Sequence, residues 1–312
     1  MDNFMFSINA TLPIFIVIVI GYLLKKYHIL DDGFVNAANR FNYRVTLPLL
    51  LFEDVANANI KDNFDLKYVL FCMIVTSICF WTIYFVAKKI IKDKSIIGAF
   101  VQASFRGSAA VLGIAFIMNI YGSVGMSPLM IIGAVPLYNI YAVFVLSMES
   151  NDDEPHNIKR TLIRVIKNPI LIGIMLGMIF SVFSVDMPVI ADKVVHSFAV
   201  LASPLALIAI GAGFKGKEAI TKLKPTIIAA FIKLLLQPMI FLPIAIAMGF
   251  TGDKMIAILI MLGAPTTPSC YIMAKNMNND EILSSSVIVM TTLLSSITLT
   301  MWIYFLRCFN CI

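Results

Sequence analysis

The chain has 312 residues, of which 60% are hydrophobic and 13% charged, with a mean hydropathy of +0.90 and a formal net charge of +6. A soluble protein of this length has too little interior for so much apolar surface, so the composition excludes an ordinary soluble fold. No basic segment is interleaved with aromatic residues, so we assign the positive charge to lysines at a lipid surface and expect no nucleic-acid partner.

Apolar runs of about 20 residues, the length that crosses a bilayer core, recur along the whole chain. They predict an all-α polytopic protein of the cell membrane. The ten expected spans are residues 4–24, 34–57, 66–91, 95–120, 127–148, 168–185, 192–214, 225–249, 255–277 and 282–306. The first is preceded by no lysine or arginine and followed by no small-residue cleavage site, so we interpret it as an uncleaved helix rather than a signal peptide.

The two halves of the chain resemble each other at an offset of 156 residues. Matching pairs at this offset are Pro13 with Pro169, Gly21 with Gly177, Pro48 with Pro204, and Lys61-Asp62 with Lys217-Glu218. When the offset is increased by four residues from the fourth span onward, Gln102–Ser108 aligns with Leu262–Pro268. We predict one five-helix repeat over residues 1–150, a cytoplasmic linker at 151–167 and a second repeat over 168–312. An odd number of spans in each makes the repeats inverted.

Lysines and arginines are concentrated at the ends of the expected spans that lie on one side of the membrane. With the N-terminus outside, seventeen of the 24 lysines and arginines fall at cytoplasmic ends and five at outer ends, and Arg106 and Lys233 lie inside spans. Cytoplasmic loops are enriched in Lys and Arg. The pattern therefore predicts that both termini lie outside.

The ninth span contains a segment that cannot form an unbroken helix, Gly263-Ala264-Pro265-Thr266-Thr267-Pro268-Ser269-Cys270. Each proline removes a backbone donor and clashes with the preceding turn. Broken backbone at membrane depth is tolerated only where it is buried in protein or lines a cavity. A simple proline kink is the alternative. The repeat places Arg106 in an equivalent segment of span four, which favours two broken helices, as in secondary transporters.

Arg106 lies near the middle of span four, within Ser104-Phe105-Arg106-Gly107-Ser108. A guanidinium there costs at least about 2.5–3.5 kcal/mol and needs a partner or a water-filled cavity. Its planar fork suits a carboxylate, while a pair with a helix carbonyl end is the structural alternative. Gly107 would let the backbone unwind or approach a ligand, or would serve close helix packing.

Four further polar residues occur within spans. Lys233 in span eight either extends to the cytoplasmic surface or is a buried cation that takes part in ion coupling. Glu53 and Asp54 are adjacent and therefore point to different sides of span two, so at most one faces inward. They either lie at the outer membrane interface or provide a proton or cation site. Asn139 either hydrogen-bonds another helix or contacts a ligand.

Catalytic and metal-binding patterns are missing from the sequence. It contains no HExxH, no GxSxG and no phosphate-cradling loop, and its three histidines lie in loops or at span ends. We therefore expect neither an enzyme nor a cofactor or metal site.

With these residues in view, the sequence resembles the auxin efflux carrier family, which includes bacterial malate permeases and plant PIN-type carriers. Segments that carry the resemblance are Leu47–Phe52, Phe105–Ser108 with Gly113-Ile114-Ala115, Pro136–Asn139, Gly263–Lys275 and Thr291–Ser295. The likeness covers essentially the whole chain. Two departures are Ser108, where the family often has Asn, and Ala115, where it often has Pro.

The resemblance implies the fold of sodium/proton antiporters and bile-acid symporters. Spans 1, 2, 6 and 7 would form a scaffold and a homodimer interface, and spans 3–5 and 8–10 a moving transport domain. It implies elevator-type transport of a small organic anion, such as malate or an auxin-like acid, bound where spans four and nine cross. The residues assigned to substrate there are Ser104, Arg106, Gly107, Ser108, Asn139, Pro265, Thr266, Thr267, Pro268 and Ser269, with Lys233, Glu53 and Asp54 as coupling candidates.

Two alternatives remain open at this point. The first is a sodium- or proton-coupled symporter of the bile-acid type, in which Glu53, Asp54 or Lys233 would matter and uptake would depend on the ion. The second is a polytopic membrane enzyme or receptor, in which substitution of Arg106 would leave substrate flux untouched.

Overall fold

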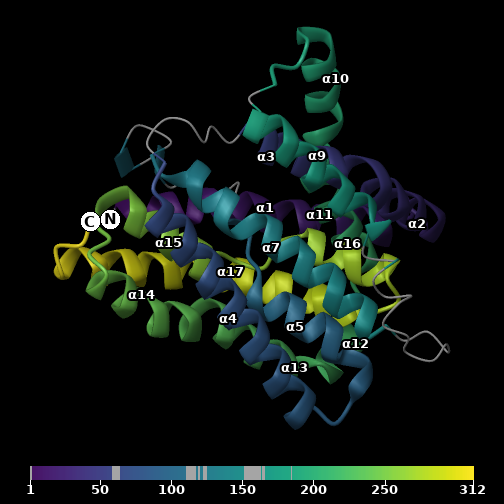
Figure 1. Cartoon of the computed structure of the whole chain (residues 1–312). Coiled ribbons are helices and arrows are strands. Elements are labelled where there is room, and N and C mark those ends of the chain that lie inside the picture. The colour runs from purple at the N-terminus through teal and green to yellow at the C-terminus, as the bar shows by residue number, and fades with distance from the viewer. Residues whose placement is uncertain are drawn as a thin grey trace.

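The computed structural model describes residues 2–57, 64–109, 117–118, 120–121, 125–150, 163, 166–183 and 185–312. Within these ranges every regular element is a helix (Figure 1). The segments 61–62 and 113–115, and most of the linker expected at 151–167, lie outside the described residues. Five helical segments are long and apolar enough to cross a membrane: Leu66–Ile90, Ser127–Met148, Val189–Gly213, Leu223–Ala247 and Glu281–Cys308. The helical, multi-pass character inferred from composition is therefore confirmed for the described part of the chain.

The first half of the chain follows the order of the expected spans. Its elements are α1 (Asp2–Lys26), α2 (Asp32–Phe41), the π-helical turn η1 (Asn42–Thr46), α3 (Leu47–Ala56), α4 (Leu66–Ile90), the 3₁₀ turn η2 (Lys94–Ile96), α5 (Ile97–Phe105) and α7 (Ser127–Met148). Aspartates begin α2 and α4. The carboxylates of Asp31 and Asp65 accept hydrogen bonds from the main-chain amides of Phe34 and Tyr68, which would otherwise lack partners.

The second half is divided into more elements than the first. Its elements are α9 (Pro169–Phe183), α10 (Val189–Ala199), α11 (Ala202–Gly213), α12 (Gly216–Thr221), α13 (Leu223–Phe231), the π-helical turn η3 (Ile232–Leu236), α14 (Gln237–Ala247), α15 (Gly252–Gly263), α16 (Ser269–Asn276) and α17 (Glu281–Cys308). Figure 1 shows α10 projecting at the top of the view, away from the other helices.

Both π-helical turns immediately precede a proline at the second position of the next helix. In η1 the amide of Leu47 bonds to the oxygen of Asn42, and Pro48 follows. In η3 the amide of Gln237 bonds to the oxygen of Ile232, and Pro238 follows. A proline ring clashes with the carbonyl four residues earlier, and the wider π turn makes room for it. Each pair of helices can thus continue as one span.

Two close helix pairs depend on glycine. At Gly21 of α1 an added Cβ would lie 2.5 Å from the main-chain oxygen of Ile208 in α11. At Gly177 of α9 it would lie 2.7 Å from the main-chain oxygen of Phe52 in α3. Small residues let membrane helices approach to backbone contact. The pairs α1–α11 and α3–α9 are the most extensive helix contacts among the described elements.

The broken helices lie in the interior. All of α5 is buried, as are residues Met255–Gly263 of α15. By contrast, α9 and α10 leave large apolar side chains exposed, among them Met175, Ile179 and Ile190. An apolar outer surface with a buried broken backbone is the arrangement expected of a protein in lipid.

Candidate functional site

Span four and span nine are both interrupted. After α5 ends at Phe105, Arg106 adopts an extended conformation (φ −104°, ψ 144°). After α15 ends at Gly263, Ala264 is extended as well (φ −65°, ψ 150°), because the residue before a proline is disfavoured in the helical region. Pro268 then returns to helical angles and leads into α16. The two interruptions expected from the sequence are therefore present in the structure.

The two interrupted segments cross and bond to each other. The amide of Ser108 donates to the oxygen of Pro265 at 2.9 Å, and the Thr266 hydroxyl donates to the oxygen of Ala103 at 2.8 Å. At the crossing, an added Cβ on Gly107 would lie 2.8 Å from the Ala264 oxygen. The close approach of the two interrupted segments therefore requires a glycine at position 107.

One helical span supplies donors to both broken ends. The Lys233 Nζ in η3 donates to the oxygens of Met261 and Leu262, at 3.0 and 2.8 Å, at the carboxyl end of α15. The Gln237 amide in α14 donates to the oxygen of Ser104 at 2.7 Å, at the carboxyl end of α5. A cation at a helix carboxyl end is stabilised by the carbonyls left unpaired there. Lys233 is fully buried and does not extend to a membrane surface.

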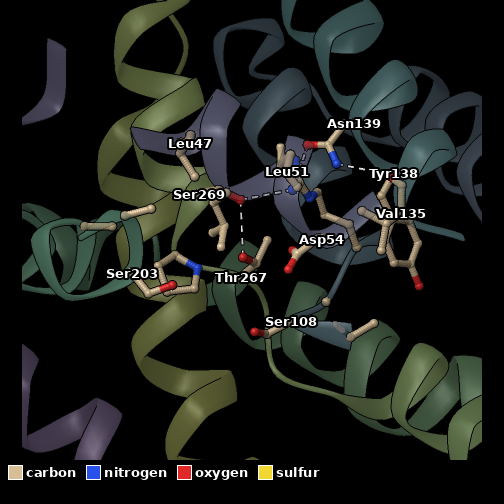
Figure 2. Close-up of a pocket in the computed structure, with 17 residues that line it drawn as sticks. Leu47, Leu51, Asp54, Ser108, Val135, Tyr138, Asn139, Ser203, Thr267 and Ser269 are labelled. Atoms are coloured by element: carbon tan, nitrogen blue, oxygen red, sulfur yellow. Dashed lines mark hydrogen bonds between the residues drawn. The ribbon is translucent and has the colours of Figure 1, made fainter. Parts of the chain in front are cut away.

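A cavity of about 60 Å³ lies beside the crossing (Figure 2). Its walls come from α3 and α11 on one side and from α7 and the two interrupted segments on the other. The lining residues are Leu47, Leu50, Leu51, Asp54, Arg106, Gly107, Ser108, Ala109, Val135, Tyr138, Asn139, Ala202, Ser203, Ala206, Thr267, Pro268 and Ser269. Hydroxyl and amide groups thus share this cavity with one carboxylate and one guanidinium.

Arg106 is the buried cation of the cavity, with 4% of its surface exposed. Its Nη2 donates to the Asn139 Oδ1 at 3.2 Å and to the Ser269 hydroxyl at 3.0 Å, and its Nη1 lies 3.1 Å from the Met273 sulfur. Among the described residues, its Nε has no hydrogen-bond partner. Every acceptor that it contacts in the described part of the chain is neutral. The guanidinium charge is therefore solvated by dipoles and left without a carboxylate.

The adjacent carboxylates on α3 face different surroundings. Glu53 lies 2.7 Å from the Nδ1 of His196 on α10, away from the cavity. Asp54 lines the cavity and faces the same space as Ser108 and Thr267 (Figure 2). No ion pair links Asp54 to Arg106 or to another described residue. One acidic side chain of the pair thus points inward.

Among the predicted substrate residues, the structure gathers seven around the cavity: Arg106, Gly107, Ser108, Asn139, Thr267, Pro268 and Ser269. The other three do not line it. The Ser104 hydroxyl donates to the oxygen of Phe100, Pro265 accepts from Ser108, and Thr266 bonds to Ala103 and to the Thr291 hydroxyl. These three residues build the crossing itself. Of the coupling candidates, Asp54 lines the cavity and Glu53 and Lys233 do not.

Apart from Asp54, sequence reasoning missed the wall formed by α3 and α11. Leu47 and Leu50 of α3 and Ser203 and Ala206 of α11 line the cavity. The 156-residue offset pairs Leu47 with Ser203 and Leu50 with Ala206, within two residues of the matched prolines Pro48 and Pro204. That register is the signal that could have found them.

The amino end of α16 faces the cavity with few free amides. The amides of Cys270 and Tyr271 already bond to the oxygens of Thr267 and Pro268 in a tight turn. The Ser269 hydroxyl lies 3.2 Å from that of Thr267. The polarity at the amino end of α16 is therefore set by the two hydroxyls, the helix dipole and Arg106. Free main-chain amides contribute less.

Interrupted, crossing helices buried among apolar spans, with polar groups around a central cavity, define a membrane transporter. A model of the membrane transport protein family matches residues 6–303. An uncharacterized transporter of Methanothermobacter thermautotrophicus is 22% identical over 300 residues, covering 96% of this chain and 98% of that protein. The uncharacterized transporter YfdV of Escherichia coli K12 is 24% identical over 317 residues, covering 97% and 98%. The chain belongs to the membrane transport protein family, and the resemblance to auxin efflux carriers is confirmed.

Proposed function

We propose that this protein is a secondary transporter that moves a small organic carboxylate across the cell membrane, with the carboxylate held at Arg106. Transport itself follows from the family. The carboxylate rests on one observation, the buried guanidinium that has no acidic partner among the described residues and opens on a cavity.

A buried cation of this kind is costly unless an anion completes its coordination. Within the described part of the chain, Arg106 contacts only neutral acceptors and its Nε has no partner. A guanidinium binds a carboxylate through two parallel hydrogen bonds, each stronger than a bond to a neutral acceptor. The hydroxyls of Ser269 and Thr267 lie beside it and can donate to the same anion.

The architecture that we propose is two inverted five-helix repeats. Its support is the pair of glycine contacts between helices. Gly21 against Ile208 and Gly177 against Phe52 are the same contact displaced by 156 residues in both partners. A duplicated chain whose copies pack reciprocally produces such paired contacts.

We propose an elevator movement, in which α4, α5, α7 and α13 to α17 shift against α1 to α3 and α9 to α11. The cavity lies between these groups, with Asp54 and Ser203 on the scaffold side and Arg106 and Ser269 on the other. A ligand held mainly by the second group could be carried past the first. We also propose that both termini lie outside, on the alternation of basic residues.

Uptake of labelled carboxylates into proteoliposomes tests the function. The wild type should accumulate at least one small carboxylate, and Arg106→Gln should reduce that uptake about tenfold or more, because a charge-assisted contact is lost. Arg307→Gln is the matched control, since Arg307 is exposed near the end of α17. Equal uptake by the wild type and Arg106→Gln would refute the assignment of the anion to Arg106.

Cysteine accessibility tests the movement. In a variant without its native cysteines, Ser108→Cys should react with an impermeant thiol reagent from either side of the membrane, in proportions that a transported ligand changes. Reaction from one side only, under every ligand condition, would contradict alternating access at this cavity.

A further inference from the structure

The cavity carries two opposite charges that do not meet. Among the described residues that line it, Asp54 and Arg106 are the charged ones, and no ion pair joins them. They come from opposite walls, Asp54 from α3 and Arg106 from the end of α5. The formal charge of this lining is therefore zero, with its positive and negative parts separated.

A simple anion does not fit this lining well. It would satisfy Arg106 but would place its charge in the same small space as the Asp54 carboxylate. Like charges in a poorly solvated space repel strongly. An unpaired carboxylate in the membrane interior is itself costly. A ligand that carries a cation beside its carboxylate would satisfy both walls at once.

No neighbouring cation in the described part of the chain takes the place of that ligand. Lys233 is bonded to the oxygens of Met261 and Leu262, and His196 pairs with Glu53 outside the cavity. The Tyr138 hydroxyl donates to the oxygen of Met261. The Asp54 carboxylate is therefore left to face the cavity and its hydroxyl groups.

The size of the cavity restricts the ligand further. One water needs about 10–15 Å³ of a cavity, so a volume of about 60 Å³ holds about four to six water-sized groups. Small amino acids have a skeleton of that size.

We propose that the ligand is a small zwitterionic amino acid, whose carboxylate binds Arg106 and whose ammonium binds Asp54. This inference rests on the proposed function and specifies its substrate class. The hydroxyls of Ser108, Ser203 and Thr267 supply further acceptors for the ammonium, since all three line the same space. Asp54 is then the residue that selects zwitterions over anions.

Three matched ligands test this proposal on the purified full-length protein in lipid nanodiscs. L-Alanine has both charges, propionate lacks the ammonium, and ethylamine lacks the carboxylate. Titration calorimetry on the wild type should show alanine binding about ten- to hundredfold more tightly than propionate, the effect of one charge-assisted contact. Ethylamine should bind more weakly than alanine.

Substitutions assign the preference to its residue. Asp54→Asn should weaken alanine binding about tenfold or more and strengthen propionate binding, because the repulsion is removed. Asp54→Glu should keep part of the preference for alanine. Asp192→Asn on exposed α10 is the control for the same change of side chain and should leave both affinities unchanged.

Several results would overturn the proposal. One is propionate binding as tightly as alanine in the wild type, which needs no variant to fold. Another is a preference for alanine that survives in Asp54→Asn. A third is tighter binding of propionate than of alanine in the wild type, with propionate binding that strengthens as the pH is lowered. If Asp54→Asn does not show this pH dependence, Asp54 carries a proton when the ligand binds and does not hold an ammonium.

The proposed function fails differently. If Arg106→Gln leaves the binding and uptake of every carboxylate unchanged, the anion site itself is wrong. If propionate binding depends on Arg106 but the ammonium adds nothing, the carboxylate site stands and only the zwitterion is refuted.

Discussion

The amide of Ser108 donates a hydrogen bond to the carbonyl oxygen of Pro265, 2.9 Å away, and so joins the two interruptions at the point where they cross. These residues lie in different halves of the chain. The bond between Thr266 and Ala103 lies beside it. The half-helices α5 and α15 are thereby fixed to each other as well as to the span that carries Lys233 and Gln237. Residues at the crossing should affect stability, and residues in the cavity should affect ligand binding.

The ammonium of Lys233 should stabilise the fold through the carboxyl end of α15. Lys233→Met keeps a similar length and removes both donors, leaving the oxygens of Met261 and Leu262 without them. The Met261 oxygen keeps the hydrogen bond from the Tyr138 hydroxyl, so the Leu262 oxygen is the acceptor that is affected most. We expect a loss of about 1–3 kcal/mol, because a buried carbonyl that loses its donor is costly while the cost of burying the ammonium is relieved. Thermal unfolding in detergent measures the change.

Lys224→Met is the control for Lys233→Met. Lys224 lies on α13 of the same span and is exposed, so its substitution should leave the unfolding temperature nearly unchanged. An unfolding temperature of Lys233→Met equal to that of the wild type would show that the two carbonyls do not need this cation.

The paired glycines should be equally intolerant of a methyl group. Gly21→Ala places a Cβ 2.5 Å from the Ile208 oxygen, and Gly177→Ala places one 2.7 Å from the Phe52 oxygen. Each substitution must separate a tightly packed helix pair, and we expect a cost of about 1–3 kcal/mol. Thermal unfolding of the two variants should show similar losses.

Gly216→Ala gives the comparison. The nearest atom to its added Cβ is 3.8 Å away, at Phe214, so this variant should not be destabilised. A large loss in Gly21→Ala but none in Gly177→Ala would contradict the reciprocal packing of the two halves.

Much of this fold follows from local rules in the sequence. Pro265 excludes a helical Ala264, and Pro268 begins a new helix, so the interruption in span nine is fixed by residue type. The apolar runs place the helices because each must be long enough for a bilayer. Arg106 is recognisable from the sequence because a guanidinium within a membrane span is rare and costly.

Other features depend on contacts between distant segments, which local rules do not contain. Nothing near Lys233 indicates that its ammonium reaches the end of α15, because that contact is set by the packing of η3 against the interruption. Thr266 and Thr267 are adjacent and chemically alike, yet one bonds across the crossing and the other lines the cavity. The sequence likewise did not decide which of Glu53 and Asp54 points inward.

An ion pair outside the spans should make stability depend on acid. The hydrogen bond from Lys254 and the amide of Tyr68 lower the pKa of Asp65, at the start of α4. Because the pKa is lower in the folded than in the unfolded protein, the stabilisation is present above the unfolded value of about 3.9 and is lost as the pH falls through the folded value. Asp65→Asn should therefore lower the unfolding temperature at neutral pH.

The difference between the wild type and Asp65→Asn should shrink on acidification, and unfolding temperatures across a pH series measure it. Asp186→Asn, in the exposed loop between α9 and α10, is the control and should show no comparable difference. A difference that grows in acid would reverse the sign expected for a lowered pKa and contradict the assignment.

Two adjacent threonines should separate the structural from the ligand-binding role. Thr266→Val removes the bond to the Ala103 oxygen, and the buried acceptor left behind should cost about 1–3 kcal/mol in thermal unfolding. Thr267→Val removes a hydroxyl that contacts only the Ser269 hydroxyl among described residues, so stability should change little while ligand affinity falls. Calorimetry and unfolding on both variants, each the other's control, test this division. If Thr267→Val binds ligand as the wild type does while Thr266→Val alone loses affinity without losing stability, the ligand contacts the crossing rather than the cavity.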